Sequence, residues 1–302
     1  MTRTGRRIAI LFHARDRERN LESYTIYHLV PFWREAGHEV QFLFGTRERP
    51  AADLVFVHVD LSVVPDEYLE FAQRYPVSVN GRVKDIRKST FSQNLLTAGD
   101  PWPGPVIVKS DLNSAGRPER LNREASRILR REIVQRTLRQ FERLTGIRPP
   151  FMTTRDYQIY NRLADVPRHQ FRDRRIVIEK FLPELEAGHY HTRIYQFLGD
   201  RSICSRLVST QPIVNVASTI RIEDVTPAPE ILAWRQRLGI DYGKLDYVVV
   251  DGRAILLDVN KTVGTVRAER TEDLRKLRRY RAAGIESFFA ANAPATAGGG
   301  PA

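Results

Sequence analysis

The sequence predicts a small α/β layer of mainly parallel strands, followed by α+β lobes with a cleft between them. Short apolar runs alternate with amphipathic segments from Arg7 to Val79. A polar stretch follows, and from Arg175 onward strand-like runs are interspersed with helices. With 302 residues and 42% hydrophobic content, the chain can bury a sizeable core and is long enough for more than one packed unit.

The first part of the chain predicts a β-α-β-β-α-β order. No G-x-G-x-x-G follows the first strand, where the sequence reads FHARDRERN, so the dinucleotide-binding fingerprint is missing. The predicted elements are the strand IAILF, a helix from about Ser23 to Ala36, the strands HEVQFLF and ADLVFVHV, a helix near Pro65 to Arg74, and the strand PVSVN.

The middle of the chain begins a new lobe after Asn80. It contains a helix-like segment SQNLL, the Pro-rich stretch DPWPGP, the strand VIVK and the polar loop DLNSAGRPE. A long amphipathic helix should follow this loop. It belongs to a basic segment, Arg117 to Arg148, to which the sequence assigns no role.

The last part predicts further strands and a hairpin, and then a tail too poor in apolar side chains to fold. We therefore expect a small α/β domain at residues 1–84, a two-lobed domain at 85–285 with a hinge near 178–184, and a disordered tail at 286–302. The predicted elements are the strands IVIEKF, HTRIYQFLGD and ICSRLVS, a helix from Glu230 to Leu238, and the hairpin KLDYVVVDGRAILLDVN.

Composition limits the functional classes. The net charge of +12 raises nucleic acid as a partner, but much of the excess lies in helix-like stretches mixed with Glu, which usually form solvated faces. No apolar run approaches the roughly 20 residues that span a bilayer, and the N-terminus does not resemble a signal peptide. With a single cysteine, Cys204, we expect a cytoplasmic protein without membrane contact.

The predicted hairpin contains the strongest chemical signal. Asp246 and Asp258 are 258 − 246 = 12 positions apart, and Asn260 follows two later. All three supply the oxygen ligands that hard cations prefer, and Asp258 and Asn260 share a strand face. For any single acid, a strand-edge or turn role is the better default, but the three together predict a magnesium-type site.

Hairpin geometry sets a condition on that site. A two-residue turn at Asp251 and Gly252 would pair Asp246 with Leu257 and turn Asp258 to the other face. Joint chelation therefore requires a loop with an odd number of residues, or a compensating β-bulge.

Magnesium in proteins usually binds phosphates as well, so cations should lie nearby. Lys109 ends the strand VIVK just before a loop that contains Ser114, whose backbone amides could close over a phosphate. Lys88 precedes this strand, although taken alone it would be read as a solvent-facing charge. Arg193, in HTRIY, could supply a planar fork to phosphate oxygens.

This ordered set resembles the ATP-grasp superfamily of ATP-dependent ligases, which includes glutathione synthetase and D-alanine ligase. The resemblance covers roughly the whole chain: a small α/β layer, a helix-borne lysine (Lys88), a strand lysine (Lys109), a covering loop (Asp111 to Gly116) and the metal hairpin. The chain departs from the pattern in having a single glycine in this loop. It also has Asp258 where a glutamate is commoner. This difference leaves open whether the site binds one metal ion or two.

The resemblance also implies roles for single residues. IVIEKFLPE would be the adenine hinge, with Glu179 facing the adenine amino group and the backbone of Lys180, Phe181 and Leu182 pairing with the ring. Glu184 or Glu186 would bind the ribose. Arg193 and Lys109 would be the catalytic cations that face the phosphates, and Asp246, Asp258 and Asn260 the ligands of Mg²⁺, or of Mn²⁺ in its place.

The resemblance implies that ATP activates a small-molecule or peptide carboxylate as an acyl phosphate, which an amine then attacks. A phosphotransferase acting on a hydroxyl, and a nucleotide- or RNA-binding protein without turnover, are the alternatives. We do not expect His189 and His191 to bind a metal. Tyr242 and Lys244 are expected either to line an acceptor pocket or to form a turn between a helix and a strand. The oligomeric state stays open, a dimer included.

Overall fold

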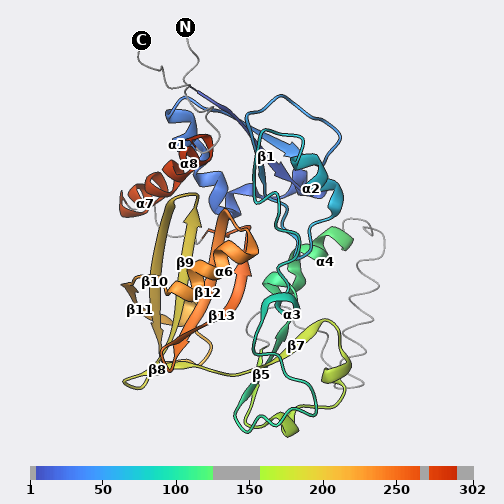
Figure 1. Cartoon of the computed structure of the whole chain (residues 1–302), viewed down its shortest axis with the longest axis vertical. Helices are drawn as coiled ribbons and strands as arrows, with labels where there is room; N and C mark the ends of the chain where they lie inside the picture. Colours follow the sequence, from blue (N-terminus) through green and yellow to red (C-terminus); the bar gives the residue numbers. More distant parts are fainter. Residues whose placement is uncertain (1–4, 125–156, 266–271, 291–302) are drawn as a thin grey trace, which may run out of the picture.

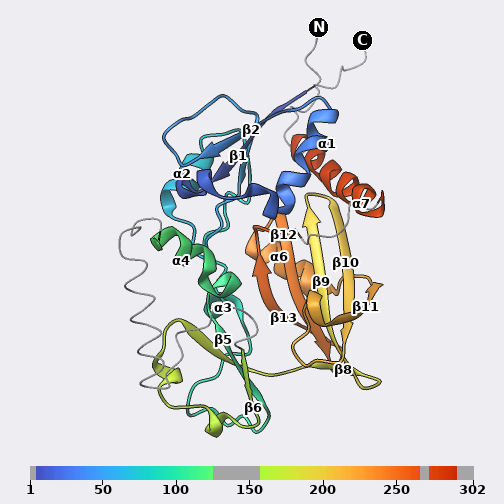
Figure 2. The same cartoon turned by 180° about the vertical axis from the view of Figure 1, so that it is seen from behind.

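A computed structural model of the chain describes residues 5–124, 157–265 and 272–290. Within these ranges the strands form a four-stranded, a three-stranded and a six-stranded sheet. Figure 1 shows the four-stranded sheet at the top, the six-stranded sheet below it and the three-stranded sheet beside the latter, and Figure 2 shows the same arrangement from behind.

The N-terminal sheet is parallel and has the order β2-β1-β3-β4, which confirms the predicted α/β layer. Alternate residues of β1 enter two different cores, because successive side chains of a strand point to opposite faces: Ile8 and Ile10 on one face, Ala9 and Leu11 on the other. The elements are β1 (Arg7–Phe12), α1 (Val30–Glu35), β2 (Glu39–Phe44), β3 (Leu54–Val57), α2 (Asp66–Ala72) and β4 (Val77–Val79).

The predicted helix from Ser23 to Ala36 is shorter than expected. The α-helix begins only at Val30, with a proline in its first turn, where the missing N–H costs no hydrogen bond. The residues before it form the 3-10 helices η2 (Leu21–Ser23) and η3 (Thr25–His28).

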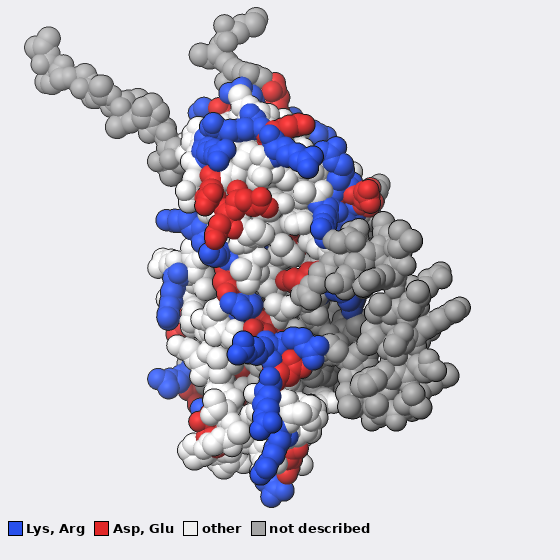
Figure 3. All heavy atoms as spheres, turned by 90° about the vertical axis from the view of Figure 1, so that its right-hand side faces the viewer, with Lys and Arg blue, Asp and Glu red and all other residues white. Residues whose placement is uncertain are grey.

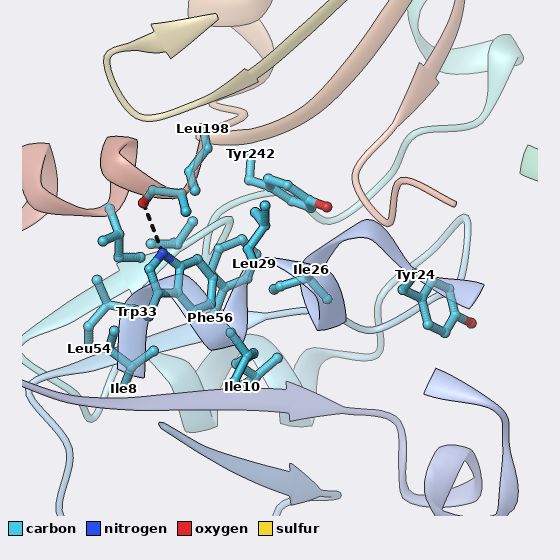
Figure 4. Close-up of a cluster of buried hydrophobic side chains, with 14 of the residues drawn as sticks. Ile8, Ile10, Tyr24, Ile26, Leu29, Trp33, Leu54, Phe56, Leu198 and Tyr242 are labelled. Atoms are coloured by element: carbon cyan, nitrogen blue, oxygen red, sulfur yellow. Dashed lines mark hydrogen bonds between the residues drawn. The ribbon is translucent and has the colours of Figure 1, made fainter. Parts of the chain in front are cut away.

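The C-terminal helices complete the core of the N-terminal sheet. Trp33 is buried there and its indole Nε1 donates to the carbonyl oxygen of Ala282 at 2.8 Å, as Figure 4 shows. Helix α7 (Glu272–Ala282) ends at this contact, η10 (Ala283–Ile285) follows, and α8 (Glu286–Ala290) places Phe288 and Phe289 against the same core. Residues 286–290 are therefore helical, and the expected disordered tail is wrong for them; 291–302 lie outside the described residues.

The three-stranded sheet is antiparallel, with the order β6-β5-β7 for β5 (Val106–Ser110), β6 (Gln158–Tyr160) and β7 (Ile176–Lys180). The helix predicted at SQNLL is wrong. The short helix α3 (Lys88–Phe91) precedes it, and the segment itself is extended because its backbone pairs with β7: the Leu96 N–H donates to the Ile178 carbonyl at 2.8 Å.

The six-stranded sheet has the order β11-β10-β9-β12-β13, and β8 pairs with β9. Helix α6 (Pro229–Leu238) covers one face, where Ile231 joins Tyr195 and Phe197 in a core. The strands are β8 (Glu184–Glu186), β9 (His189–Leu198), β10 (Arg201–Ser209), β11 (Thr219–Asp224), β12 (Tyr242–Val250) and β13 (Arg253–Asn260).

The covering loop forms η4 (Asn113–Gly116) and leads into α4 (Arg117–Glu124). The rest of the predicted basic helix lies outside the described residues. Further 3-10 helices are η1 (Ala14–Glu18), η7 (Leu163–Asp165), η8 (Gln170–Arg172) and η9 (Val216–Ser218).

Surface charge on the face shown in Figure 3 is mixed, because Lys and Arg side chains are interspersed with Asp and Glu. This mixture is typical of solvated helix faces. None of the described helices combines the length and apolar character that a membrane-spanning helix needs.

Candidate functional site

A pocket of about 890 Å³, part of it open to solvent, lies between the three-stranded and six-stranded sheets. Its walls come from β5, β7, β9, β12 and β13, from the segment after β7 and from the loop between β10 and β11. The lining residues are Lys88, Ile107, Lys109, Tyr157, Glu179 to Pro183, His191, Thr192, Pro212 to Asn215, Asp246, Val248, Leu257 and Asp258.

The β12–β13 hairpin contains the compensating bulge that joint chelation requires. Its turn has two residues, Asp251 and Gly252, both with positive φ, at 49° and 74°. This two-residue turn pairs Val250 with Arg253, and the register then shifts between Asp246 and Tyr247. Leu257 is the extra residue, and Asp246 therefore lies directly opposite Asp258. The two carboxylates share one face of the sheet.

Three lysines surround these carboxylates. Lys88 Nζ lies 2.8 Å from Asp258 Oδ1, and Lys244 Nζ donates to both oxygens of Asp246, at 2.6 and 3.0 Å. Lys109 Nζ lies 2.5 Å from Glu179 Oε2 and also donates to the carbonyl of Leu257 at 3.2 Å. The bulge thus presents a carbonyl that fixes Lys109 beside the carboxylate pair.

The electrostatics of this group follow from burial and ion pairing. Burial raises the pKa of Asp246, and Lys244 offsets this only in part. Burial also acts to raise the pKa of Asp258, but Lys88 and Lys244 outweigh it and hold that pKa below its usual value. Burial opposes the charge of Lys88, yet Asp258 keeps the Lys88 pKa above its ordinary value. Both partners of the Lys88–Asp258 pair are therefore charged at neutral pH.

Arg193 does not face the carboxylates, which corrects its predicted role. It pairs in register with Tyr247, the neighbour of Asp246, so it points to the opposite face of the sheet. There its guanidinium lies 2.7 Å from Glu184 Oε1. Glu184 also accepts the N–H of Val249 at 2.7 Å, so its carboxylate binds the protein and does not line the pocket.

Other predicted residues lie elsewhere or have other partners. Glu186 is exposed and pairs with Arg206 at 2.7 Å, which argues against a ribose contact. Ser114 lies on the covering loop and is exposed, outside the pocket lining. Asn260 opposes Lys244 on the shared face, and its Oδ1 accepts the N–H of Thr262 at 2.8 Å.

The hinge residues line the pocket, as expected, but their backbone is partly engaged. The N–H of Lys180 donates to the carbonyl of Asn94, and that of Phe181 to the carbonyl of Pro105, both at 2.9 Å. Glu179 is buried and is the partner of Lys109. The main-chain groups left to pair with a ligand therefore lie toward Leu182.

Lys244 is the residue that the sequence analysis did not assign to the charged site. A signal was present, because residues two apart on a strand share a face and Lys244 precedes Asp246 by two. His191 also lines the pocket and is buried. Within the described residues, no group of three or more His, Cys, Asp or Glu side chains is placed to hold a metal ion.

Comparison with solved structures confirms the predicted fold. D-alanine–D-alanine ligase from Bacillus anthracis is similar over 95% of this chain and 98% of that chain, with a TM-score of 0.51 and 12% identity. A RimK domain ATP-grasp protein from Sphaerobacter thermophilus is similar over 94% of this chain and 99% of that chain, with a TM-score of 0.47 and 12% identity. The macrocyclase MdnC from Microcystis aeruginosa is similar over 92% of this chain and 98% of that chain, with a TM-score of 0.43 and 13% identity. No protein-family model and no curated protein matches the chain.

Proposed function

We propose that this chain, which has the ATP-grasp fold, is an ATP-dependent ligase that activates a carboxylate as an acyl phosphate for attack by an amine. The observation that supports it most is the bulge at Leu257, which turns Asp246 and Asp258 toward each other inside the pocket. A regular hairpin would have separated them. The hairpin keeps its two-residue turn and its strand pairing, and the one extra residue brings both carboxylates to the same face. This arrangement would allow both carboxylates to bind one ligand.

The donor set fits Mg²⁺. This ion is usually held by one or two carboxylates together with phosphate oxygens, and Asp246 and Asp258 provide the carboxylates. Asn260 lies on the same face, and an amide oxygen has two lone pairs, so its bond to Thr262 leaves one for a cation. Bound Mg²⁺ would neutralise charge on the phosphates during transfer.

The lysines would hold the phosphates. Lys88, Lys109 and Lys244 supply three positive charges against Asp246, Asp258 and Glu179, so the site is balanced as it stands. With Mg-ATP bound, Asp246 and Asp258 would hold the metal, and Lys88, Lys109 and Lys244 would be free to contact phosphate oxygens. Transfer then depends on positioning and on charge neutralisation, with no protein nucleophile.

The base would lie between apolar side chains of the two sheets. Ile107 of β5 lines one side of the pocket, and Val248 and Leu257 of the hairpin line the other. Main-chain groups near Leu182 would pair with the edge of the adenine. This arrangement supports a flat, partly apolar ligand with a charged end, which is what ATP offers.

Separate assays of ADP and phosphate test the proposal. Purified protein is incubated with ATP, Mg²⁺ and pools of carboxylates and amines, and both products are measured, with Asp258→Asn as the control. A ligase forms ADP and phosphate together and needs both substrates. ADP without phosphate would instead indicate a phosphotransferase that acts on a hydroxyl. Nucleotide binding without either product in any pool would indicate a binding protein and contradict the ligase.

A further inference from the structure

The outer edge of the six-stranded sheet is formed by β11, which pairs with β10 on one side and, among the described residues, with no strand on the other. Figure 1 shows β11 at the left margin of this sheet. An edge strand presents a row of unpaired backbone N–H and C=O groups, to which a further strand can add. Natural edge strands often carry Lys or Pro, which discourage such pairing, but β11 reads TIRIED and has neither. This edge is therefore open to strand addition.

The side chains at this edge are partly apolar. Ile220 and Ile222 of β11 are 59% and 65% exposed, and Ile222 is the most exposed large hydrophobic side chain in the described part of the chain. Val216, on η9 just before the strand, is 59% exposed. None of the three lines the pocket, so the proposed function does not use them. Exposed apolar side chains that are grouped in this way mark interaction surfaces.

The direction of the backbone groups of β11 follows from one hydrogen bond. The N–H of Val225 donates to the carbonyl oxygen of Cys204, on β10, at 3.0 Å. In an antiparallel pair, residues whose backbone groups bond to the partner strand alternate with residues whose groups face away from it. Glu223 and Arg221 therefore bond to β10. Ile222, between them, directs its N–H and C=O to the free edge.

We propose that a second copy of this chain pairs its β11 with this edge, antiparallel and with the two-fold axis at Ile222. Pairing of a surface with its own copy about a two-fold axis is the isologous arrangement of a closed dimer. A residue that directs its N–H and C=O to the edge must lie opposite another residue that does so. The axis therefore passes through a residue and not between two, which leaves Arg221, Ile222 and Glu223 as candidate centres near the middle of the strand.

Charge selects Ile222 among these positions. A centre at Arg221 would place two arginines directly opposite each other, and a centre at Glu223 would place two glutamates there. Like charges in opposed positions are destabilising. A centre at Ile222 instead places Arg221 opposite the partner's Glu223, and this opposition occurs twice because of the symmetry. It also brings the two Ile222 side chains together on the other face of the sheet.

The charged side chains are held in place within each copy. Arg221 lies 2.7 Å from Glu223 of its own strand, and Arg206 of β10 lies 2.8 Å from the same carboxylate. Hydrogen bonds from Arg206 and Arg221 hold the pKa of Glu223 below its ordinary value, so Glu223 is charged at neutral pH. The register with β10 is irregular only between Val208 and Ser209, opposite the start of β11. The central part of β11 is therefore regular and charged as the pairing requires.

The dimer would join two six-stranded sheets into one continuous sheet. The loop between β10 and β11 lines the pocket with Pro212 to Asn215, so each pocket would have one wall next to the interface. The proposal does not depend on ligase activity, because the edge itself lies outside the pocket.

Association of full-length variants tests the proposal. Sedimentation velocity at protein concentrations up to about 100 µM detects dimers with dissociation constants in the micromolar range. We expect wild type to form a dimer and Ile222→Lys to weaken it by at least about tenfold, because two lysines would meet at the axis. Leu232→Lys, at an exposed leucine on α6, is the matched control and should dimerise as wild type does.

Charge variants test the register. Arg221→Glu and Glu223→Arg each place like charges opposite each other in a homodimer, so each should dimerise at least about tenfold more weakly than wild type. In an equal mixture, an Arg221→Glu chain can pair with a Glu223→Arg chain, and both opposed pairs then carry opposite charges. A heterodimer should therefore form in the mixture.

The outcomes decide between this interface and none. A wild type that stays monomeric at about 100 µM overturns the proposal, and so does a dimer that Ile222→Lys leaves unchanged. A dimer that Ile222→Lys weakens, but that the mixture of charge variants does not restore, overturns the register. Thermal unfolding followed by circular dichroism checks folding, and Ile222→Lys should unfold as wild type does because the side chain is exposed.

Discussion

Two groups of buried and half-buried carboxylates in this protein differ in the residues that balance their charge. In the hairpin site, Asp246, Asp258 and Glu179 each have a lysine within 2.8 Å. In a second group, at the carboxyl ends of β1 and β3, Asp16 has Arg19 at 2.8 Å and Asp60 accepts hydrogen bonds from the hydroxyls of Tyr24 and Thr262. A balanced site favours a ligand that brings its own cation and anions, as Mg-ATP does.

The largest expected effect comes from breaking the balanced site. Asp258→Asn removes one of two opposed carboxylates and leaves Lys88 without its partner at 2.8 Å. Mutation of residues that only orient metal ligands typically lowers metal affinity or activity by about 10–100-fold. We therefore expect loss of a ligand itself to lower magnesium-dependent turnover by at least about 100-fold. Steady-state ADP formation measures this, and near-wild-type rates would remove Asp258 from the site.

Substitution of Lys109 and of Arg193 should have different effects, because only Lys109 lies beside the carboxylates of the hairpin site. Lys109→Ala should weaken ATP binding by about tenfold or more, the worth of one charge-assisted hydrogen bond. Arg193→Ala should leave ATP affinity almost unchanged and destabilise the fold, because Glu184 loses its partner on the opposite face. Calorimetric titration and urea unfolding of both variants distinguish the effects. Equal losses of affinity would restore Arg193 to the phosphate site.

The burial of Asp16 predicts a pH-dependent stability effect. The Asp16 pKa is raised from 3.8 to about 6, so the stabilising effect of its neutral form is present below pH 3.8 and is lost as pH rises through 6. The ionised form then costs up to about 3 kcal/mol at pH 8. We therefore expect Asp16→Asn to raise the free energy of unfolding more at pH 8 than at pH 5. Urea titrations with Glu18→Gln as control test it, and a loss of stability at pH 8 would contradict it.

The smallest effect is expected at the hinge. Phe181 lines the pocket, and its N–H is already bonded to Pro105, so its side chain contributes packing alone. Phe181→Leu should change ATP affinity by no more than about threefold, as expected for replacement of one apolar side chain by another. A loss of about 100-fold would mean that the ring itself contacts the base.

The hairpin could be predicted further than the rest of the site because its geometry is local. A two-residue turn fixes the register of the first pairs, so opposition of Asp246 and Asp258 required a bulge, and the bulge lies at Leu257. The face of Arg193 depends on how β9 pairs with β12, which is a nonlocal contact. The spacing of residues within HTRIY does not show which face of the sheet Arg193 lies on. Lys244, and not Arg193, lies beside the carboxylates.

The group formed by Asp16, Asp60, Glu119 and Lys261 could not be predicted for a related reason. Its residues come from four segments, at positions 16, 60, 119 and 261, and meet only when the parallel sheet, α4 and the end of β13 pack together. The parallel layer itself was predictable, because apolar runs of β1 and β3 are buried on both faces and read as continuous hydrophobic stretches.

The most direct test of the account is whether Asp246 and Asp258 hold the metal of Mg-ATP. Calorimetric titration of a non-hydrolysable ATP analogue into wild type and Asp258→Asn, with and without Mg²⁺, measures this. The account predicts that Mg²⁺ strengthens binding by about tenfold or more in wild type and has little effect in the variant, while both bind the metal-free analogue. The same magnesium dependence in both proteins would contradict it.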